Sequence, residues 1–185
     1  MRGIILGVFA LGLLLVPPGG GMRSVSGYLL IAVGIALRVS ARTVIGDHSR
    51  GKALEAPSLV TAGVYSRVRH PLYLSNLLIG SGFALVQLGW QTLTFAFVSG
   101  LFLFVFLLAS EEDRFLSERF GAEFEKWRAD TPAFFPGARA KSAFVKKTGC
   151  ISVKKYFTAF IADKWTWIWL LFYSLLLVLR NKGVG

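Results

Sequence analysis

Long apolar runs alternate with shorter polar and basic segments along the 185 residues of this chain. The longest run, from Leu72 to Ser110, holds 39 residues without one charge. As a single helix it would extend roughly 58 Å, about twice the ~30 Å hydrocarbon core of a bilayer. Because Leu88-Gly89-Trp90 divides the run, we expect a hairpin of two membrane spans with Trp90 at the far interface.

Three further apolar runs predict three further spans. The first covers residues 3–16 and ends in a Pro-Gly turn. Since that turn is not a small-x-small cleavage site, we interpret the run as a retained span rather than a signal peptide. The second begins near Ser24 and is uncharged through Leu37, and the last occupies residues 157–180. The pattern therefore predicts an all-α integral membrane protein with about five transmembrane helices.

The segment after the hairpin, residues 111–129, is charged but periodic. Its apolar side chains recur at spacings of four, four and three: Leu116, Phe120, Phe124 and Trp127. This stripe is typical of an amphipathic helix, which we place on the cytoplasmic face of the membrane. Residues 139–155 then carry six Lys and Arg and no acid, which indicates a segment lying on anionic lipid.

Composition and charge support a single membrane domain covering residues 1–185. Hydrophobic residues make up 54% of the chain, the mean hydropathy is +0.58 and the formal net charge is +11. Of the 21 Lys and Arg, four lie in residues 46–70 and ten in 111–156, which share one side of the membrane if there are five spans. We therefore place these segments and the N-terminus in the cytoplasm and the C-terminus outside. Basic loops beside spans need only lipid headgroups as partners, so we expect no nucleic acid, and no obligate protein partner is evident.

A single cysteine, Cys150, excludes an intrachain disulfide and a multi-cysteine metal site, so we expect no metal. The compact length, without a eukaryotic targeting tag, favours a prokaryotic inner membrane.

Ionisable residues stand at both ends of the predicted hairpin. Arg69 and His70 precede Pro71, which suits the first turn of a helix, and Glu112 with Asp113 follows the second span. Two acids facing an anionic leaflet are best explained if they meet a cation, either a basic side chain or a ligand. Aromatic rings next to them, at Tyr65 and Tyr73, can cradle a purine or a positively charged sulfonium, although the physics alone does not single out either.

Polar residues also interrupt two spans. Arg38 and Arg42 lie four residues apart on one helical face, where they either extend to the headgroups or line a ligand cavity. Asn76 on the third span either bonds to a neighbouring helix or contacts a substrate.

Several motifs in residues 58–136 stand in a fixed order and spacing. They are Thr61-Ala62-Gly63-Val64-Tyr65, Arg69-His70-Pro71-Leu72-Tyr73, Glu112-Asp113 with Leu116, Phe120-Gly121 with Phe124, and Pro136. Together they resemble the isoprenylcysteine carboxyl methyltransferase family of integral membrane methyltransferases, a group that also includes phospholipid and bacterial thiol methyltransferases. The resemblance implies a methyltransferase that uses S-adenosylmethionine in a cytoplasm-facing pocket.

Carried over by position, the resemblance also implies which residues contact the cofactor. They are Leu59, Val60, Tyr65, His70, Pro71, Leu72, Tyr73 and Glu112. Four positions depart from the family pattern: Ser75 replaces a glycine, Asp113 a glutamate, Phe124 a tyrosine, and Leu108 a substrate-binding arginine. The last change makes a prenylcysteine carboxylate a doubtful acceptor.

The acceptor therefore stays open between an isoprenoid carboxylate, a phospholipid amine and a thiol, with the catalytic residues unassigned. A carboxylate or thiolate needs no base, whereas an amine or hydroxyl would need a proton removed by Tyr73, His70 or Glu112. A lipid would enter sideways between spans, past Asn76 and Arg42.

Two other functions compete with this interpretation. A membrane reductase related to the sterol reductases shares a similar Arg-His-Pro segment and uses NADPH, although this chain is short for that fold. A non-catalytic membrane scaffold would need none of Tyr65, His70, Tyr73 or Glu112.

Overall fold

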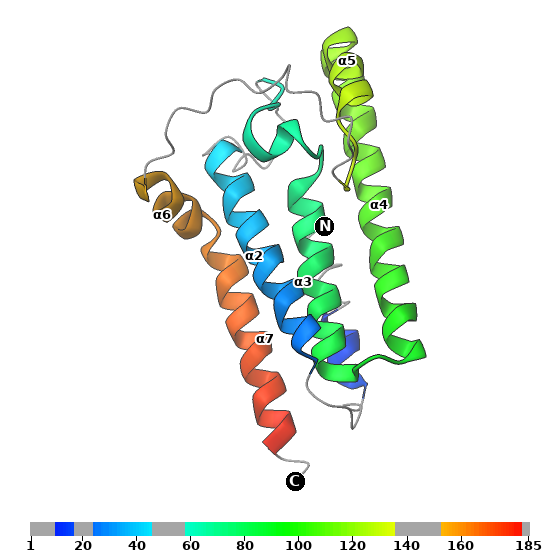
Figure 1. Cartoon of the computed structure of the whole chain (residues 1–185), viewed down its shortest axis with the longest axis vertical. Coiled ribbons are helices and arrows are strands. Elements are labelled where there is room, and N and C mark those ends of the chain that lie inside the picture. Colours follow the sequence, from blue (N-terminus) through cyan, green and yellow to red (C-terminus); the bar gives the residue numbers. More distant parts are fainter. Residues whose placement is uncertain (1–9, 17–23, 46–57, 136–152, 183–185) are drawn as a thin grey trace.

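The computed structural model describes residues 10–16, 24–45, 58–135 and 153–182. The described residues form helices and contain no strand (Figure 1). The elements are α2 (Val25–Ile45), the 3-10 turn η2 (Gly63–Ser66), α3 (Pro71–Leu88), α4 (Thr92–Phe120), α5 (Ala122–Asp130), α6 (Val153–Ala162) and α7 (Lys164–Lys182). The prediction of an all-α fold is confirmed.

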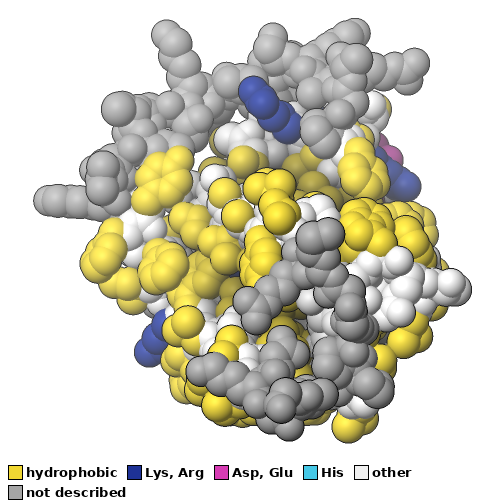
Figure 2. Space-filling model, turned by 60° about the horizontal axis from the view of Figure 1, so that its bottom comes forward, with side chains coloured by type: hydrophobic (Ala, Val, Ile, Leu, Met, Phe, Trp, Pro, Cys, Tyr) yellow, Lys and Arg dark blue, Asp and Glu magenta, His cyan; other side chains and the backbone are white. Residues whose placement is uncertain are grey.

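Three helices, α2, α3 and α4, are long and apolar enough to cross a membrane, and the bent pair α6–α7 makes a fourth candidate span. These four correspond to the last four predicted spans. Most of the predicted first span, residues 3–16, lies outside the described residues, of which 10–15 are helical. Hydrophobic side chains cover most of the described surface in the view of Figure 2, which fits an integral membrane protein.

Helix α3 packs directly against α2 because glycines remove the side chains between them. A Cβ built on Gly82 would lie 2.6 Å from the carbonyl oxygen of Gly27, and one built on Gly27 would lie 2.8 Å from that of Gly82. Gly34 makes a similar approach, with its Cβ position 3.1 Å from the oxygen of Ser75. The two backbones are therefore in contact along their length.

A tight turn joins α3 to α4, as the sequence predicts. Gly89 ends α3 with φ of 72°, a conformation that favours glycine, and its carbonyl accepts a 2.7 Å hydrogen bond from Thr94 Oγ1. The start of α3 and the charged end of α4 consequently lie at the same end of the molecule (Figure 1).

The charged end of α4 differs from the prediction of a separate amphipathic helix at 111–129. Helix α4 continues through this segment to Phe120, so its 29 residues extend about 43 Å. The break comes at Gly121, where φ is 51°, and α5 begins after it. The predicted stripe is correct, since Phe124 and Trp127 are buried, but the predicted start of the helix is wrong.

The C-terminal span predicted at 157–180 is also two helices rather than one. α6 and α7 meet at an angle of 67° around Asp163. The lower half of α7 packs on α3, where the rings of Tyr173 and Phe83 lie 4.9 Å apart edge to face and the Tyr173 hydroxyl bonds Gln87 at 3.4 Å. Gln87 also donates to the carbonyls of Leu13 and Val16, so residues 10–16 are bonded to the C-terminal end of α3.

Candidate functional site

The start of α3 is fixed by the segment that follows α5. The backbone N–H groups of Arg69 and His70 donate to the carbonyls of Pro132 and Ala133, at 2.9 and 3.0 Å. Pro71 occupies the first turn of α3, where its missing N–H costs no hydrogen bond. Backbone bonds thus attach the start of α3 to the segment after α5, whereas side chains join it to the end of the second hairpin span.

Asp113 joins the two ends of the hairpin through a partly buried contact with two basic residues. Its carboxylate lies 2.8 Å from His70 Nε2 and 3.2 Å from Arg69 Nη1. Burial lowers the pKa of Arg69, and the charge of Asp113 opposes that change. The expectation that an acid here meets a cation is therefore confirmed for Asp113, which meets a basic side chain.

Glu112 faces a different partner. The Tyr73 hydroxyl donates to Glu112 Oε2 at 2.7 Å, which links α3 to α4 a second time. Burial raises the pKa of Tyr65, and the negative charge of Glu112 adds to the rise, whereas Arg42 and Arg38 oppose it. These groups lie close enough to affect the Tyr65 phenol, which stays neutral at physiological pH.

An apolar cluster lies next to this polar pair. Its buried members are Ala41, Tyr65, Phe124 and Trp127, and the partly buried residues packed on them include Leu59, Val60 and Leu72. The Trp127 side chain is 2% exposed, yet its Nε1 has no hydrogen-bond partner among the described residues. A buried donor of this kind costs about 1–3 kcal/mol unless an acceptor is supplied.

The structure thus divides the eight predicted cofactor contacts into two adjoining groups. Leu59, Val60, Tyr65 and Leu72 belong to the apolar cluster, and His70, Pro71, Tyr73 and Glu112 lie at the start of α3 and its contact with α4. His70 bonds Asp113 rather than Glu112. The sequence reasoning did not single out Trp127 as a site residue, although its place in the predicted apolar stripe was a signal for its burial.

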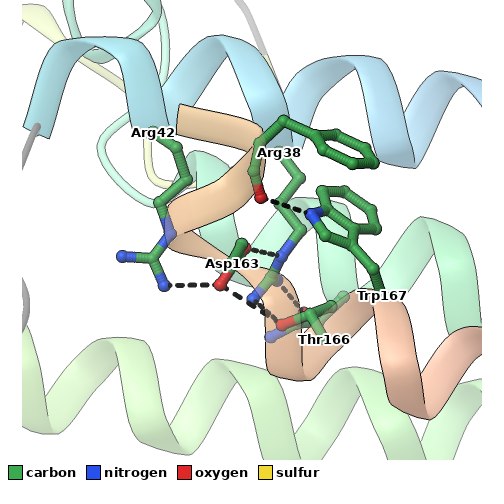
Figure 3. A network of polar contacts seen from close by, with 7 residues as sticks. Arg38, Arg42, Asp163, Thr166 and Trp167 are labelled. Carbon is green, nitrogen blue, oxygen red and sulfur yellow. Dashed lines mark hydrogen bonds and ion pairs between the residues drawn. The ribbon is translucent and has the colours of Figure 1, made fainter. Parts of the chain in front are cut away.

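Arg42, one of the two residues predicted to contact the acceptor, takes part in a largely buried polar network around Asp163 (Figure 3). Asn76, the other, joins the network through Arg38. Arg38 Nη1 donates to Asn76 Oδ1 at 2.7 Å, so Asn76 does bond a neighbouring helix. Both arginines bind Asp163, with Arg42 Nη2 3.0 Å from its Oδ1. Sequence reasoning missed Asp163, although an acidic residue within an apolar C-terminal segment was a usable signal.

An open hollow of about 290 Å³ adjoins the site on the α4–α5 side. Its lining residues are Ser110, Asp113, Arg114, Ser117, Glu118 and Arg128. Within the part of the chain that the structure describes, no three His, Cys, Asp or Glu side chains come together as metal ligands.

Comparison with known proteins identifies relatives of this chain. Residues 22–123 match the family model described as phospholipid methyltransferase, a stretch that includes both ends of the hairpin and stops before α6. A cobalt-zinc-cadmium resistance protein, CzcN, of Cupriavidus metallidurans is 42% identical over 83 residues, 43% of this chain and 36% of its own length. A nickel-cobalt-cadmium resistance protein, NccN, of Alcaligenes xylosoxydans is 34% identical over 102 residues, 51% of this chain and 45% of its own.

This chain therefore spans less than half the length of these two curated relatives. No solved structure matches it significantly.

Proposed function

The chain belongs to the phospholipid methyltransferase family, whose model matches more than half of its residues, and from that premise we propose that it is an S-adenosylmethionine-dependent methyltransferase. Its acceptor would be a lipid or another hydrophobic molecule of the membrane. The observation that carries this proposal is the Tyr73–Glu112 hydrogen bond at 2.7 Å, which brings together the two sequence motifs of the site.

The residues at this end of the bundle fit the cofactor's chemistry. Glu112 places a carboxylate beside the ring of Tyr73, a combination that attracts a cation. The apolar side chains of Leu59, Val60 and Leu72 suit a nucleoside, and the buried Trp127 Nε1–H offers a donor to one of its acceptor atoms. Asp113 fixes His70 and thereby the first turn of α3. When bound, the cofactor supplies a methyl group already activated on a positively charged sulfur.

The protein's task is then to align the acceptor and exclude water, which approximation alone makes effective. Tyr65 is a poor relay, because burial raises its pKa and its phenol therefore gives up its own proton less readily than an ordinary tyrosine. For an amine or hydroxyl acceptor, we infer that Tyr73 relays the proton to Glu112, to which its hydroxyl already donates. A carboxylate or thiolate acceptor would need no such step.

The most direct test of the activity is methyl transfer in reconstituted vesicles. We would incubate the purified protein with tritiated S-adenosylmethionine in phosphatidylethanolamine vesicles, in vesicles containing N-acetyl-S-farnesylcysteine, and with a small hydrophobic thiol. We expect label in one of the three products. Glu112→Gln should lose most of this activity, whereas Glu111→Gln, a neighbouring acid whose side chain is 62% exposed, should keep it. Unlabelled products in all three assays would contradict the proposal.

A further inference from the structure

Asp163, at the bend between α6 and α7, is a buried acid that is bonded to two arginines. Asp163 is 6% exposed and Arg38 is 8% exposed. The carboxylate accepts hydrogen bonds from Arg38 Nε and from Arg42 Nη2, and Arg38 Nη2 donates to Thr166 Oγ1 at 3.0 Å. Figure 3 shows the two guanidinium groups converging on this one carboxylate from α2.

The bend that presents Asp163 is built by local bonds. The backbone N–H groups of Thr166 and Trp167 donate to the carbonyl of Asp163, and the Trp167 indole Nε1 donates to the carbonyl of Phe160 at 2.6 Å. The rings of Trp167 and Phe160 stack with centroids 4.6 Å apart. These contacts hold the carboxylate at a defined position rather than on a freely moving segment.

The network continues from the proposed cofactor site into the membrane-spanning part of the bundle. Asn76 follows Tyr73 by three residues on α3, so both side chains lie on the same face of that helix. Tyr73 bonds Glu112, Asn76 accepts from Arg38, and Arg38 bonds Asp163. Polar side chains therefore follow one another from Glu112 on α4, through α3 and α2, to the α6–α7 bend. Asn76 is only partly buried, unlike Arg38 and Asp163. Intramembrane ionisable groups of this kind are rare and usually functional.

We propose that Asp163 is a positioning residue for the methyl acceptor: by holding Arg38 it fixes Asn76 and Arg38 as the surface that receives the acceptor's polar head. This proposal rests on the proposed methyltransferase function. It assigns to the C-terminal helix pair, which lies outside the family-matched residues 22–123, a part in acceptor recognition. The acceptor class that it fits is a membrane lipid whose head group carries both hydrogen-bond donors and acceptors, because the surface offers an amide and a guanidinium together.

A purely structural role for Asp163, as a pin between α7 and the bundle, predicts a different result. α7 is also attached to the bundle further along its length, where the Tyr173 hydroxyl donates a hydrogen bond to Gln87. Tyr173→Phe removes that bond without touching the proposed site, and it serves as the control for loosened attachment of α7.

The experiment compares Asp163→Asn, Asp163→Glu, Tyr173→Phe and the wild type in two assays. The first is calorimetric binding of S-adenosylhomocysteine. The second is tritium transfer to vesicles that contain both phosphatidylethanolamine and N-acetyl-S-farnesylcysteine, at several mole fractions of acceptor. For Asp163→Asn we expect an apparent KM for the lipid raised about tenfold or more, with the cofactor-product affinity within about threefold of the wild type. Asp163→Glu should recover part of the loss, and Tyr173→Phe should leave the KM unchanged.

The outcomes separate this proposal from the proposed function. If the wild type fails to bind S-adenosylhomocysteine, the proposed function itself fails. If the wild type is active and Asp163→Asn matches it, or loses cofactor-product binding in parallel with activity, the positioning role is overturned. The wild type could bind S-adenosylhomocysteine and yet methylate neither lipid. In that case the lipid that co-purifies with each protein is measured by mass spectrometry. The positioning role predicts less bound lipid for Asp163→Asn than for the wild type or Tyr173→Phe, and equal amounts would overturn it.

Discussion

At the scale of residues, two adjacent acids have separate partners. Glu112 accepts a bond from Tyr73, whereas Asp113 bonds His70 and pairs with Arg69. Successive side chains on an α-helix point about 100° apart, so neighbouring acids on α4 reach different groups of α3 and the segment before it. Asp113 thereby fixes the geometry of the site, and Glu112 is the acid whose charge affects the Tyr65 phenol.

Tyr65 gives a test of this electrostatic environment. An unfolded tyrosine ionises near pH 10. The folded protein holds the Tyr65 proton to higher pH because burial and Glu112 raise its pKa, so the folded state binds more protons than the unfolded state above pH 10 and loses stability as the pH rises. We expect Tyr65→Phe to show a smaller fall in Tm between about pH 9 and 11 than the wild type.

The matched control is Tyr156→Phe, which changes an exposed tyrosine and should follow the wild-type curve. A Tyr65→Phe protein whose Tm falls as steeply as that of the wild type would show that Tyr65 does not carry the shift.

The sequence predicts which residues lie together at the start of α3 better than it predicts their pairings. Pro71, Tyr73 and Glu112 lie in motifs whose spacing along the chain already brings them to one end of a hairpin. The partner of Arg38 cannot be found in this way, because Asp163 is 125 residues away and only the packing of α6 on α2 brings it there. The burial of Trp127 follows from its stripe, but its unpartnered Nε1 follows only from the packed cluster.

Among the helices, α3 is more enclosed than α2 or α4, and small residues make this possible. Gly27 and Gly82 bring the backbones of α2 and α3 into contact, while the other side of α3 faces α4. The closeness of this contact places Asn76 within reach of Arg38. The α2–α3 contact therefore supports the proposed acceptor surface as well as stability.

Substitution at this contact tests that dependence. The added Cβ of Gly82→Ala would meet the Gly27 carbonyl oxygen, which is backbone and cannot move without shifting a helix. We expect a loss of about 1–3 kcal/mol of stability, measured as a lower Tm in detergent.

Gly80→Ala on the same helix is the control. There the added Cβ would meet the end of the Leu101 side chain, which can rotate away, so a smaller loss is expected. Equal stability of Gly82→Ala and the wild type would contradict the close helix contact.

The helix boundaries are a feature that the pattern of apolar and charged residues does not predict. The appearance of charges at Glu111 marks the end of an apolar run, but helical hydrogen bonds do not depend on the polarity of side chains, and α4 continues for ten more residues. The actual break depends on the local backbone at Gly121, whose φ is positive. In the same way, the apolar character of the C-terminal segment does not predict the bend between α6 and α7. Contacts between Asp163 and α2 hold that bend.

In the whole molecule, α5, η2 and the start of α3 lie towards one end of the bundle, and α7 runs to the opposite end (Figure 1). Fourteen of the chain's 21 Lys and Arg fall in residues 46–70 and 111–156, two segments that the sequence predicts to share one side of the membrane. By the positive-inside rule we infer that this end faces the cytoplasm, where a soluble cofactor would reach the site.

The chain's single cysteine tests this orientation directly. Cys150 lies outside the described residues, in the basic segment predicted to be cytoplasmic. We expect a membrane-impermeant maleimide to leave Cys150 unlabelled in intact cells and to label it in inside-out vesicles. Trp90→Cys in a Cys150→Ser background, at the opposite turn between α3 and α4, should give the reverse pattern. Labelling of Cys150 in intact cells would show that the protein has the opposite orientation in the membrane.

We propose that the end of the bundle joined by Tyr73 and Glu112 binds S-adenosylmethionine. The most direct measurement is a calorimetric titration of the purified protein with S-adenosylhomocysteine, with NADPH as the parallel ligand. We expect binding of S-adenosylhomocysteine alone, weakened about tenfold or more by Glu112→Gln and unchanged by Glu111→Gln. Binding of NADPH alone, or wild-type affinity for S-adenosylhomocysteine in Glu112→Gln, would contradict it.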